Sequence, residues 1–232
     1  AESGLQEAEY FLGLIHYNGQ GVIQDYEDAY NWFVKAAHHG SSQAQNQVAM
    51  LLLEGLGVEK NETKAVHYFR MAAEQGDADA QCNLGVLIMK GRGVPQSDKE
   101  AVEWYRLAAV QEDAAAMANL GSMLLAGRGV AQNDKEAMRW FREAAAQGEP
   151  MALFHVGLMY ELGRGGVAQC EEQAKQWYSM AAEQGFPKAM INLWLLNLPL
   201  FLRIILSSKC WKEFGFSSVV FVFAAYVAQF HI

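Results

Sequence analysis

The sequence predicts an all-α protein built from stacked helix pairs. Three observations lead to this prediction: a motif that recurs every 36 residues, small and aromatic residues at helical spacing within each copy, and 21 glycines against only 4 prolines. Abundant Gly with scarce Pro indicates many similar helix ends rather than a mixture of strands and turns. Because 52% of the residues are hydrophobic, the chain has enough apolar material for a folded core, which excludes wholesale disorder.

The recurring motif combines small residues, closely spaced glycines and a pair of aromatic residues. In the third copy it reads Ala80, Leu84-Gly85, Gly91, Gly93-Val94, Ala101, Trp104-Tyr105 and Ala108-Ala109. Copies start near Ala8, Ala44, Ala80, Ala116 and Ala152, and a partial sixth starts at Ala189 and stops matching at Trp194, where the frame requires Gly. Self-similarity of this period is typical of repeat architectures, so we assign residues 1–192 to a repeat array and 193–232 to a divergent C-terminal tail.

Each copy divides into two predicted helices. The first, such as residues 80–89, contains no Pro and is followed by Gly91 and Gly93, which permit a tight exit. The second begins after a predicted capping box, Ser97 with Glu100 in the third copy and Asn133 with Glu136 in the fourth. Its Ala and aromatic residues then recur along one stripe. Since one helix pair cannot bury this stripe alone, at least three copies are needed, and five are present.

The copies resemble Sel1-like repeats, the 36-residue relatives of the tetratricopeptide repeat, from Ala8 to about Leu193. The resemblance implies a right-handed α/α superhelix, or solenoid, of about five helix-turn-helix repeats. It also implies that the first helices line a concave groove and that the protein is an adaptor in protein complexes. Three residues depart from the frame: Ala49 replaces the repeat Gly, Glu112 replaces the helix-ending Gly, and Cys170 occupies a capping position that suits Ser, Asp or Asn.

The charge of the chain limits its partners. The net charge is -8, and since the last forty residues hold three basic residues and one acidic residue, the array itself carries -10. Nucleic-acid binding rests on clustered Lys and Arg, so we expect no nucleic-acid partner. If charge contributes to binding, an array this acidic favours basic partners.

We expect no enzymatic activity, no metal and no cofactor. The Gly-Arg-Gly loops follow helices and lack a third Gly, and neither Gly-Lys-Ser/Thr nor Gly-x-Ser-x-Gly occurs. No His-Glu-x-x-His is present, and the three cysteines (Cys82, Cys170 and Cys210) form no Cys-x-x-Cys pair. Some cysteine-rich relatives have been labelled β-lactamases, but this chain lacks their paired cysteines and any Ser-x-x-Lys motif. A β-lactamase-like hydrolase is therefore only a remote alternative.

One position on the first helix recurs as a polar residue and is our candidate for partner binding. Three places after the leading Ala stand Gln47, Asn83, Asn119 and His155. Amides beside a buried Leu suit a groove, where they can hydrogen bond an extended peptide backbone. An Asn on the first helix does this in the tetratricopeptide family, which is what the resemblance implies here. The alternative is that these side chains tie one repeat to the next.

Four basic residues extend the predicted partner-binding surface. Lys90 lies on the same helix face as Asn83, seven residues further along, and the loops after the first helices carry Arg92, Arg128 and Arg164. The loop arginines could bind carboxylates of a partner. The alternative is that they are solvated loop residues.

The tail has a different composition from the array. Residues 214–232 contain no charged residue, and this stretch is close to the roughly 20 residues that span a bilayer. Three alternatives stay open: apolar helices covering the open end of the array, membrane attachment, or a non-native terminus. We therefore expect a monomeric, non-enzymatic protein-protein interaction scaffold or adaptor that binds a protein or peptide. The alternative is a membrane-associated assembly or quality-control factor anchored by residues 193–232, and the compartment is left open.

Overall fold

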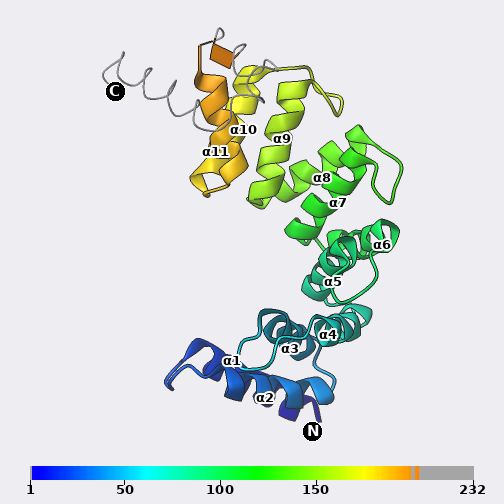
Figure 1. Ribbon diagram of the computed structural model, residues 1–232, viewed down its shortest axis with the longest axis vertical. Coiled ribbons are helices and arrows are strands. Elements are labelled where there is room, and N and C mark those ends of the chain that lie inside the picture. The colour runs from blue at the N-terminus through cyan, green and yellow to red at the C-terminus, as the bar shows by residue number, and fades with distance from the viewer. Residues whose placement is uncertain (1, 200–201, 204–232) are drawn as a thin grey trace.

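The computed structural model describes residues 2–199, 202 and 203, and over these residues it consists of eleven α-helices and no strand (Figure 1). The helices are α1 (Glu2–Asn18), α2 (Tyr26–His38), α3 (Ser42–Glu54), α4 (Glu62–Glu74), α5 (Ala78–Lys90), α6 (Asp98–Val110), α7 (Ala114–Ala126), α8 (Asp134–Ala146), α9 (Pro150–Leu162), α10 (Glu171–Glu183) and α11 (Pro187–Asn197). The predicted all-α repeat array is confirmed.

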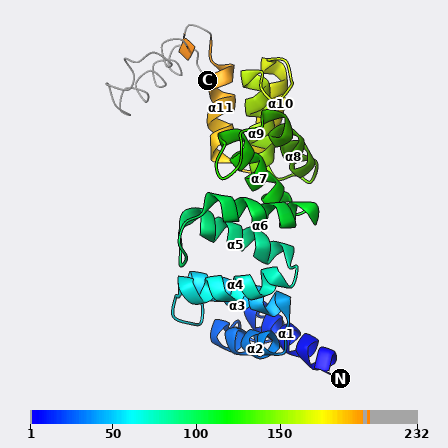
Figure 2. The same ribbon diagram turned by 90° about the vertical axis from the view of Figure 1, so that its right-hand side faces the viewer.

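The helices form a curved stack in which each helix packs against the next along the chain. Figure 1 shows that α3 and α5 lie on the inner side of the curve while α4 and α6 lie on the outer side. The view turned by 90° shows the same stack as successive layers from the N-terminal to the C-terminal end (Figure 2). In the middle of the array the first helices therefore lie on the concave, inner face.

The helix ends follow the repeat. The second helices α2, α4, α6 and α8 begin with a side-chain cap, from Asp25, Asn61, Ser97 and Asn133 respectively. At Asn61, for example, the side-chain Oδ1 accepts the Lys64 N–H at 2.9 Å. Cys170, at the N-cap of α10, accepts no such bond. The first helices α3, α5, α7 and α9 each end at a Gly in the left-handed region, for example Gly91 at φ 65°.

The predicted capping boxes form only in part. The Ser97 hydroxyl does accept the Glu100 N–H, at 3.2 Å. The Ser97 N–H, however, donates to the Ile88 carbonyl at 3.2 Å, and the Glu100 carboxylate instead accepts a hydrogen bond from Arg70 at 3.0 Å. The reciprocal bond from the capping residue to Glu100 was therefore a wrong prediction, because this carboxylate is used to join two repeats.

The core depends on a Gly of the first helix facing an aromatic ring of the second. A Cβ added at Gly85 would lie 2.7 Å from Tyr105, and one at Gly121 would lie 2.7 Å from Phe141. These rings are fully buried, as are the equivalent rings Phe33, Phe69 and Tyr178. Close approach of the two helices therefore requires the absence of a side chain at the Gly. In α11, Trp194 stands at this place in the frame.

Polar contacts between residues 30 apart join successive repeats. Five are ion pairs between an Arg and a carboxylate. In two of them an Arg of a second helix reaches the start of the next second helix, Arg70–Glu100 and Arg106–Glu136. In three a loop Arg reaches back to the preceding repeat, namely Arg92–Glu62, Arg128–Asp98 and Arg164–Asp134. Two more are amide pairs in which an exposed Gln donates to a buried one: Gln75 to Gln45 at 2.7 Å and Gln111 to Gln81 at 2.9 Å. In the next copy the acceptor place is taken by Met117, and the Gln147 side chain donates to the Glu112 carbonyl instead.

Glu112 keeps the backbone geometry of the glycine that it replaces. Its φ is 66°, and it is the only non-glycine residue in the described part of the chain with positive φ. The other copies place Gly40, Gly76, Gly148 and Gly185 here. The repeat frame therefore imposes a left-handed conformation that costs an L-residue energy.

Most of the predicted tail falls on residues that the structure does not describe. These are residues 200–201 and 204–232, so the three alternatives for the tail and the membrane-attachment hypothesis lie outside the described residues. Within the described part, no helix is both long and apolar enough to cross a membrane.

Candidate functional site

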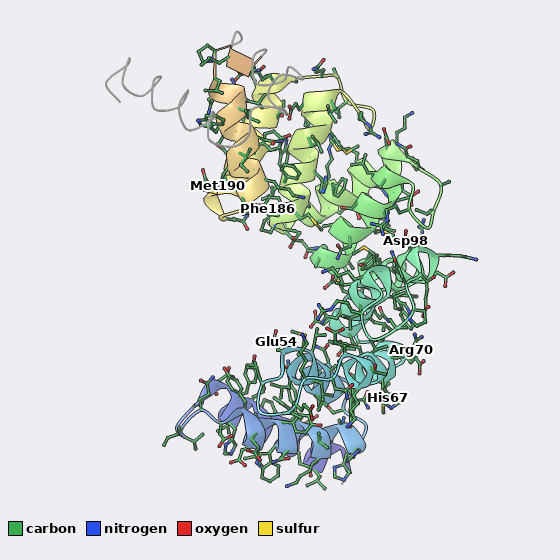
Figure 3. The ribbon with its side chains drawn as sticks, in the orientation of Figure 1. Glu54, His67, Arg70, Asp98, Phe186 and Met190 are labelled. Carbon is green, nitrogen blue, oxygen red and sulfur yellow. The ribbon has the colours of Figure 1, made fainter. Side chains whose placement is uncertain are left out.

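The inner face of the array holds a hollow of about 390 Å³ between α3, α5 and α7, which we call the central hollow. It is lined by Tyr17, Asn46, Gln47, Met50, Asp79, Cys82, Asn83, Asp113 and Ala115. Two of the predicted partner-binding residues, Gln47 and Asn83, are therefore brought together here. Both side chains are partly exposed, so they are accessible from the inner side of the curve, the side on which Glu54 lies in Figure 3.

Among the predicted partner-binding amides, Asn83 and Asn119 make only long contacts with the neighbouring repeat. Asn83 Nδ2 lies 3.5 Å from Asn46 Oδ1 and 3.9 Å from Met50 Sδ, and Asn119 Nδ2 lies 3.8 Å from Cys82 Sγ. Hydrogen bonds at these distances are weak, and sulfur is a poor acceptor. The amides thus touch the neighbouring repeat while keeping most of their hydrogen-bonding capacity for another partner.

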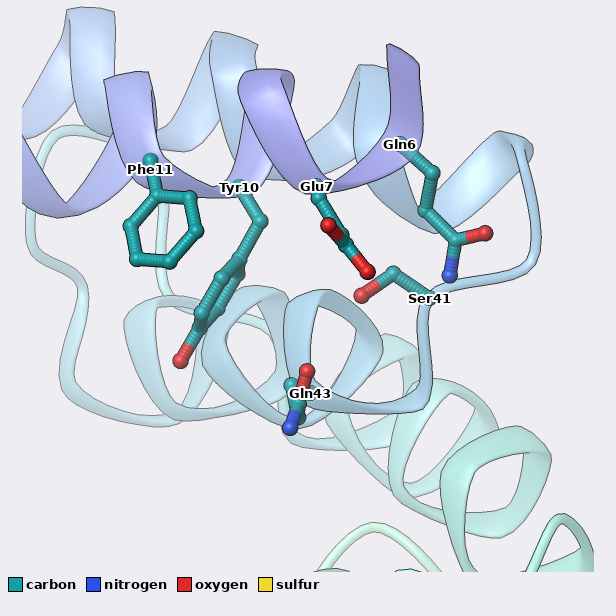
Figure 4. A pocket seen from close by; sticks show the side chains of 6 residues that line it. All are labelled: Gln6, Glu7, Tyr10, Phe11, Ser41 and Gln43. Carbon is teal, nitrogen blue, oxygen red and sulfur yellow. The ribbon is translucent and has the colours of Figure 1, made fainter. Parts of the chain in front are cut away.

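A second hollow of about 530 Å³, the N-terminal hollow, lies between α1 and α3. Figure 4 shows its lining side chains, Gln6, Glu7, Tyr10, Phe11, Ser41 and Gln43. Five of these six places recur in the central hollow two repeat periods later: Glu7 corresponds to Asp79, Tyr10 to Cys82, Phe11 to Asn83, Ser41 to Asp113 and Gln43 to Ala115. The two hollows are consequently equivalent positions along the inner face of the array, which we call the groove. In the N-terminal hollow Phe11, which is 60% exposed, takes the place of the amides.

Burial and negative charge both mark the central hollow. Burial raises the pKa of the Cys82 thiol to about 12, with further contributions from the carboxylates of Asp113 and Asp79. In the N-terminal hollow the pKa of Tyr10 is also raised, first by burial and then by the charges of Asp77 and Asp79. A thiol with so high a pKa is protonated at neutral pH and is not a nucleophile. Among the described residues no group of three or more His, Cys, Asp and Glu side chains is arranged to hold a metal ion.

His155 differs from the amides that precede it in the row. Its ring stacks on Phe141 with centroids 4.6 Å apart and an interplanar angle of 11°. Burial lowers its pKa to about 4, with a smaller contribution from the charge of Lys188. Nε2 lies 3.5 Å from the Ser122 hydroxyl, and Nδ1 is buried without a hydrogen-bond partner. The side chain is therefore neutral at pH 7 and packs in part as an aromatic ring.

The loop arginines do not share the hollow with the amides. Each makes two hydrogen bonds to a carboxylate of the preceding repeat, as Arg128 does to Asp98 and Arg164 does to Asp134 at 2.8 and 2.9 Å. Arg92 bonds Glu62 in the same way. These pairs lie at the start of second helices, so the arginines act between repeats, a role that neither sequence alternative contained. Lys90 is exposed at the last residue of α5.

The 36-residue repeat matches a known family of repeats. The Sel1 repeat model matches residues 6–41, 42–77, 78–113, 114–149 and 150–186. The chain belongs to the Sel1 repeat family. Sel1 repeat proteins are generally protein-interaction scaffolds and are typically non-enzymatic. A comparison with curated proteins finds no match.

Solved structures show the same Sel1 architecture. The chain is 39% identical to c5321, a protective antigen present in uropathogenic Escherichia coli strains, with a TM-score of 0.74 over 83% of this chain and 41% of that one. It therefore spans about two fifths of the length of c5321. A Sel1 repeat protein from Oxalobacter formigenes is 30% identical, with a TM-score of 0.78 over 84% and 79% of the two chains. The immunity protein Pa5087 from Pseudomonas aeruginosa, at 21% identity, TM-score 0.54 and coverage of 79% and 67%, shares the fold alone.

Sequence reasoning missed the acidic residues of this Sel1 groove. Asp79 and Asp113 line the central hollow, yet the candidates selected from the sequence were amides, a histidine and basic residues, with no carboxylate among them. A signal was available for Asp79, because it precedes Asn83 by four residues and therefore lies on the same helix face. Asp113 was harder to identify as a groove residue from the sequence, because it is also the N-cap of α7, where its carboxylate accepts the Ala116 N–H at 2.6 Å.

Proposed function

We propose that this Sel1 array is a non-enzymatic scaffold that binds a peptide or protein segment along the groove formed by its first helices. The observation that carries the proposal is the repetition of one hollow, in register, on the inner face of α1, α3, α5 and α7. A series of equivalent hollows suits an extended or helical segment that contacts several repeats in turn.

The half-exposed amides support this role. Gln47 and Asn83 lie at the same place in successive repeats, and the contacts that Asn83 makes inside the array are long or go to sulfur. They can therefore donate and accept hydrogen bonds to the backbone of a bound segment without breaking strong internal bonds.

We also expect the array to act as a monomer, which sedimentation velocity would test.

The test is affinity capture with matched variants. The array and its Asn83→Ala/Asn119→Ala variant are used as baits, and the captured proteins are compared by quantitative mass spectrometry. We expect at least one captured protein to be depleted severalfold by the variant, because both substitutions remove groove hydrogen bonds. Circular dichroism and thermal melting should be nearly unchanged, since only weak contacts are lost.

The control is Glu74→Gln/Glu103→Gln, which alters two exposed side chains on the second helices α4 and α6. A partner bound in the groove is retained by this control and lost by the amide variant. If every captured protein is retained by both variants, the groove is not the binding site and the proposal fails.

A further inference from the structure

The groove is lined by acidic side chains and lacks basic ones. Glu7 belongs to the N-terminal hollow, and Asp79 and Asp113 belong to the central hollow. No Lys, Arg or His lines either hollow. Neither Glu7 nor Asp79 forms an ion pair with any residue between 2 and 203 that the structure describes. The inner face therefore presents carboxylates that are available to a partner.

The basic side chains of the array lie outside the two hollows. Lys90 is the single basic residue in the sequences of α3, α5 and α7, and it stands at the last residue of α5. Five arginines of the loops and second helices pair with carboxylates of a neighbouring repeat, among them Arg92 with Glu62 and Arg128 with Asp98. These ion pairs lie outside the two hollows, whereas no basic side chain lines either hollow.

Two carboxylates share the central hollow with one thiol. Asp79 and Asp113 line this hollow together with Cys82, and the charges of both add to the effect of burial in raising the pKa of the thiol. Beside them, Tyr17 and Met50 line the same hollow and provide apolar surface. Apolar surface beside carboxylates suits a Lys or Arg side chain, because its methylene stem packs on apolar atoms while its charged end reaches an anion.

We infer that the groove binds a partner segment that carries Lys or Arg, with one cationic side chain held in the central hollow by Asp79 and Asp113. The inference rests on the proposed groove function and names the class of segment that fits it. Charge complementarity would set the register of the segment, while Gln47 and Asn83 bond its backbone. Attraction from the acidic groove would also raise the association rate at low salt.

The experiment is an unbiased selection of peptides on the intact chain. A phage-displayed library of random dodecapeptides is selected on the immobilised protein, and the enriched peptides are synthesised and measured by fluorescence anisotropy. We expect enrichment of Lys and Arg over the starting library. The Asp79→Asn/Asp113→Asn variant should bind these peptides roughly tenfold more weakly, with a smaller dependence on salt. Asn is also an effective N-cap, so this variant keeps the cap of α7.

The control for total charge is again Glu74→Gln/Glu103→Gln, which removes the same number of charges from the outer side. Equal weakening by the two variants would show that attraction is diffuse and would overturn the inference. Enriched peptides without basic residues, lost in Asn83→Ala but unaffected by Asp79→Asn/Asp113→Asn, would overturn it while leaving the groove function intact. Peptides insensitive to every groove variant would overturn both.

Discussion

The guanidinium of Arg128 donates two hydrogen bonds, over 3.0 and 2.7 Å, to the carboxylate of Asp98, which lies 30 residues earlier in the chain. The same relationship joins Arg164 to Asp134, whereas Arg92 donates two hydrogen bonds to one oxygen of Glu62. Successive repeats are therefore linked by bidentate ion pairs as well as by their apolar contacts, and each link involves nearest neighbours only.

The Arg128–Asp98 pair should contribute modestly to stability. Both side chains are partly exposed, so a double-mutant cycle with Arg128→Gln and Asp98→Asn should give a coupling energy of about 0.5–1 kcal/mol. Urea unfolding of the four proteins measures it, and 1 M NaCl should reduce it. A coupling energy of zero in low salt would show that the pair does not join the repeats energetically.

Replacing Glu112 by Gly should stabilise the array. The residue holds a φ of 66°, and Gly adopts this conformation without strain, so we expect a gain of about 1 kcal/mol in the free energy of unfolding. The measurement is chemical denaturation at neutral pH. Glu112→Ala removes the same side chain but keeps the Cβ, so a similar gain in that control would assign the effect to the carboxylate rather than to the backbone.

Cys170→Ser should improve the start of α10. The Cys170 side chain makes no capping bond, whereas Ser, Asn and Asp do so at the equivalent places, and restoring the bond should add about 1 kcal/mol. Thermal melting of Cys170→Ser and Cys170→Ala separates capping from removal of the thiol. Equal melting temperatures for the two variants would contradict the prediction.

Gly121→Ala should destabilise the fourth repeat. The new Cβ would lie 2.7 Å from the buried Phe141 ring, and overpacking of this kind should outweigh the gain in helix propensity, leaving a net loss of about 1–2 kcal/mol. Gly4 is also helical, but a Cβ added there would have no atom within 4 Å, so Gly4→Ala should be neutral or slightly stabilising. Urea unfolding compares the two, and equal effects would argue against a steric role for Gly121.

Stability should fall as the pH is lowered through a range set by His155. Its pKa is about 4 in the folded protein against the usual 6.5, so the unfolded state binds the proton more strongly. The contribution is complete above pH 6.5 and is lost as pH falls toward 4. Between pH 7 and 4.5 the protein should lose about 2–3 kcal/mol more than His155→Phe, measured by urea unfolding. Parallel pH profiles of the two proteins would contradict this.

Much of the fold could be predicted because the repeat shows directly in the sequence. The glycines that end first helices, the Ala-aromatic stripe of second helices and the caps at Asn61 and Ser97 all recur in phase, so each copy supports the assignment of the others. A departure from the frame, such as Glu112, also marked the position where the structure shows strain.

The contacts between repeats could not be predicted in the same way. The partner of Arg92 lies 30 residues away, and this offset depends on how one helix pair rotates relative to the next rather than on the pattern within a copy. The same reason applies to Glu100, whose role as a capping-box residue gave way to its pairing with Arg70. For the groove, the amides were visible as a recurring row, whereas an acidic residue stands at the place of Asp79 in only two copies, as Glu7 and as Asp79.

Trp194 has a consequence for lengthening this protein by design. At the equivalent place Gly85 and Gly121 admit the aromatic ring of the following helix, which a Cβ alone would obstruct. A consensus second helix grafted after α11 would bring its buried aromatic ring against the indole of Trp194 rather than against the backbone of a glycine. Any longer synthetic array built on this chain should therefore begin with Trp194→Gly, and the length of the groove, together with the length of segment that it could hold, would then become adjustable one repeat at a time.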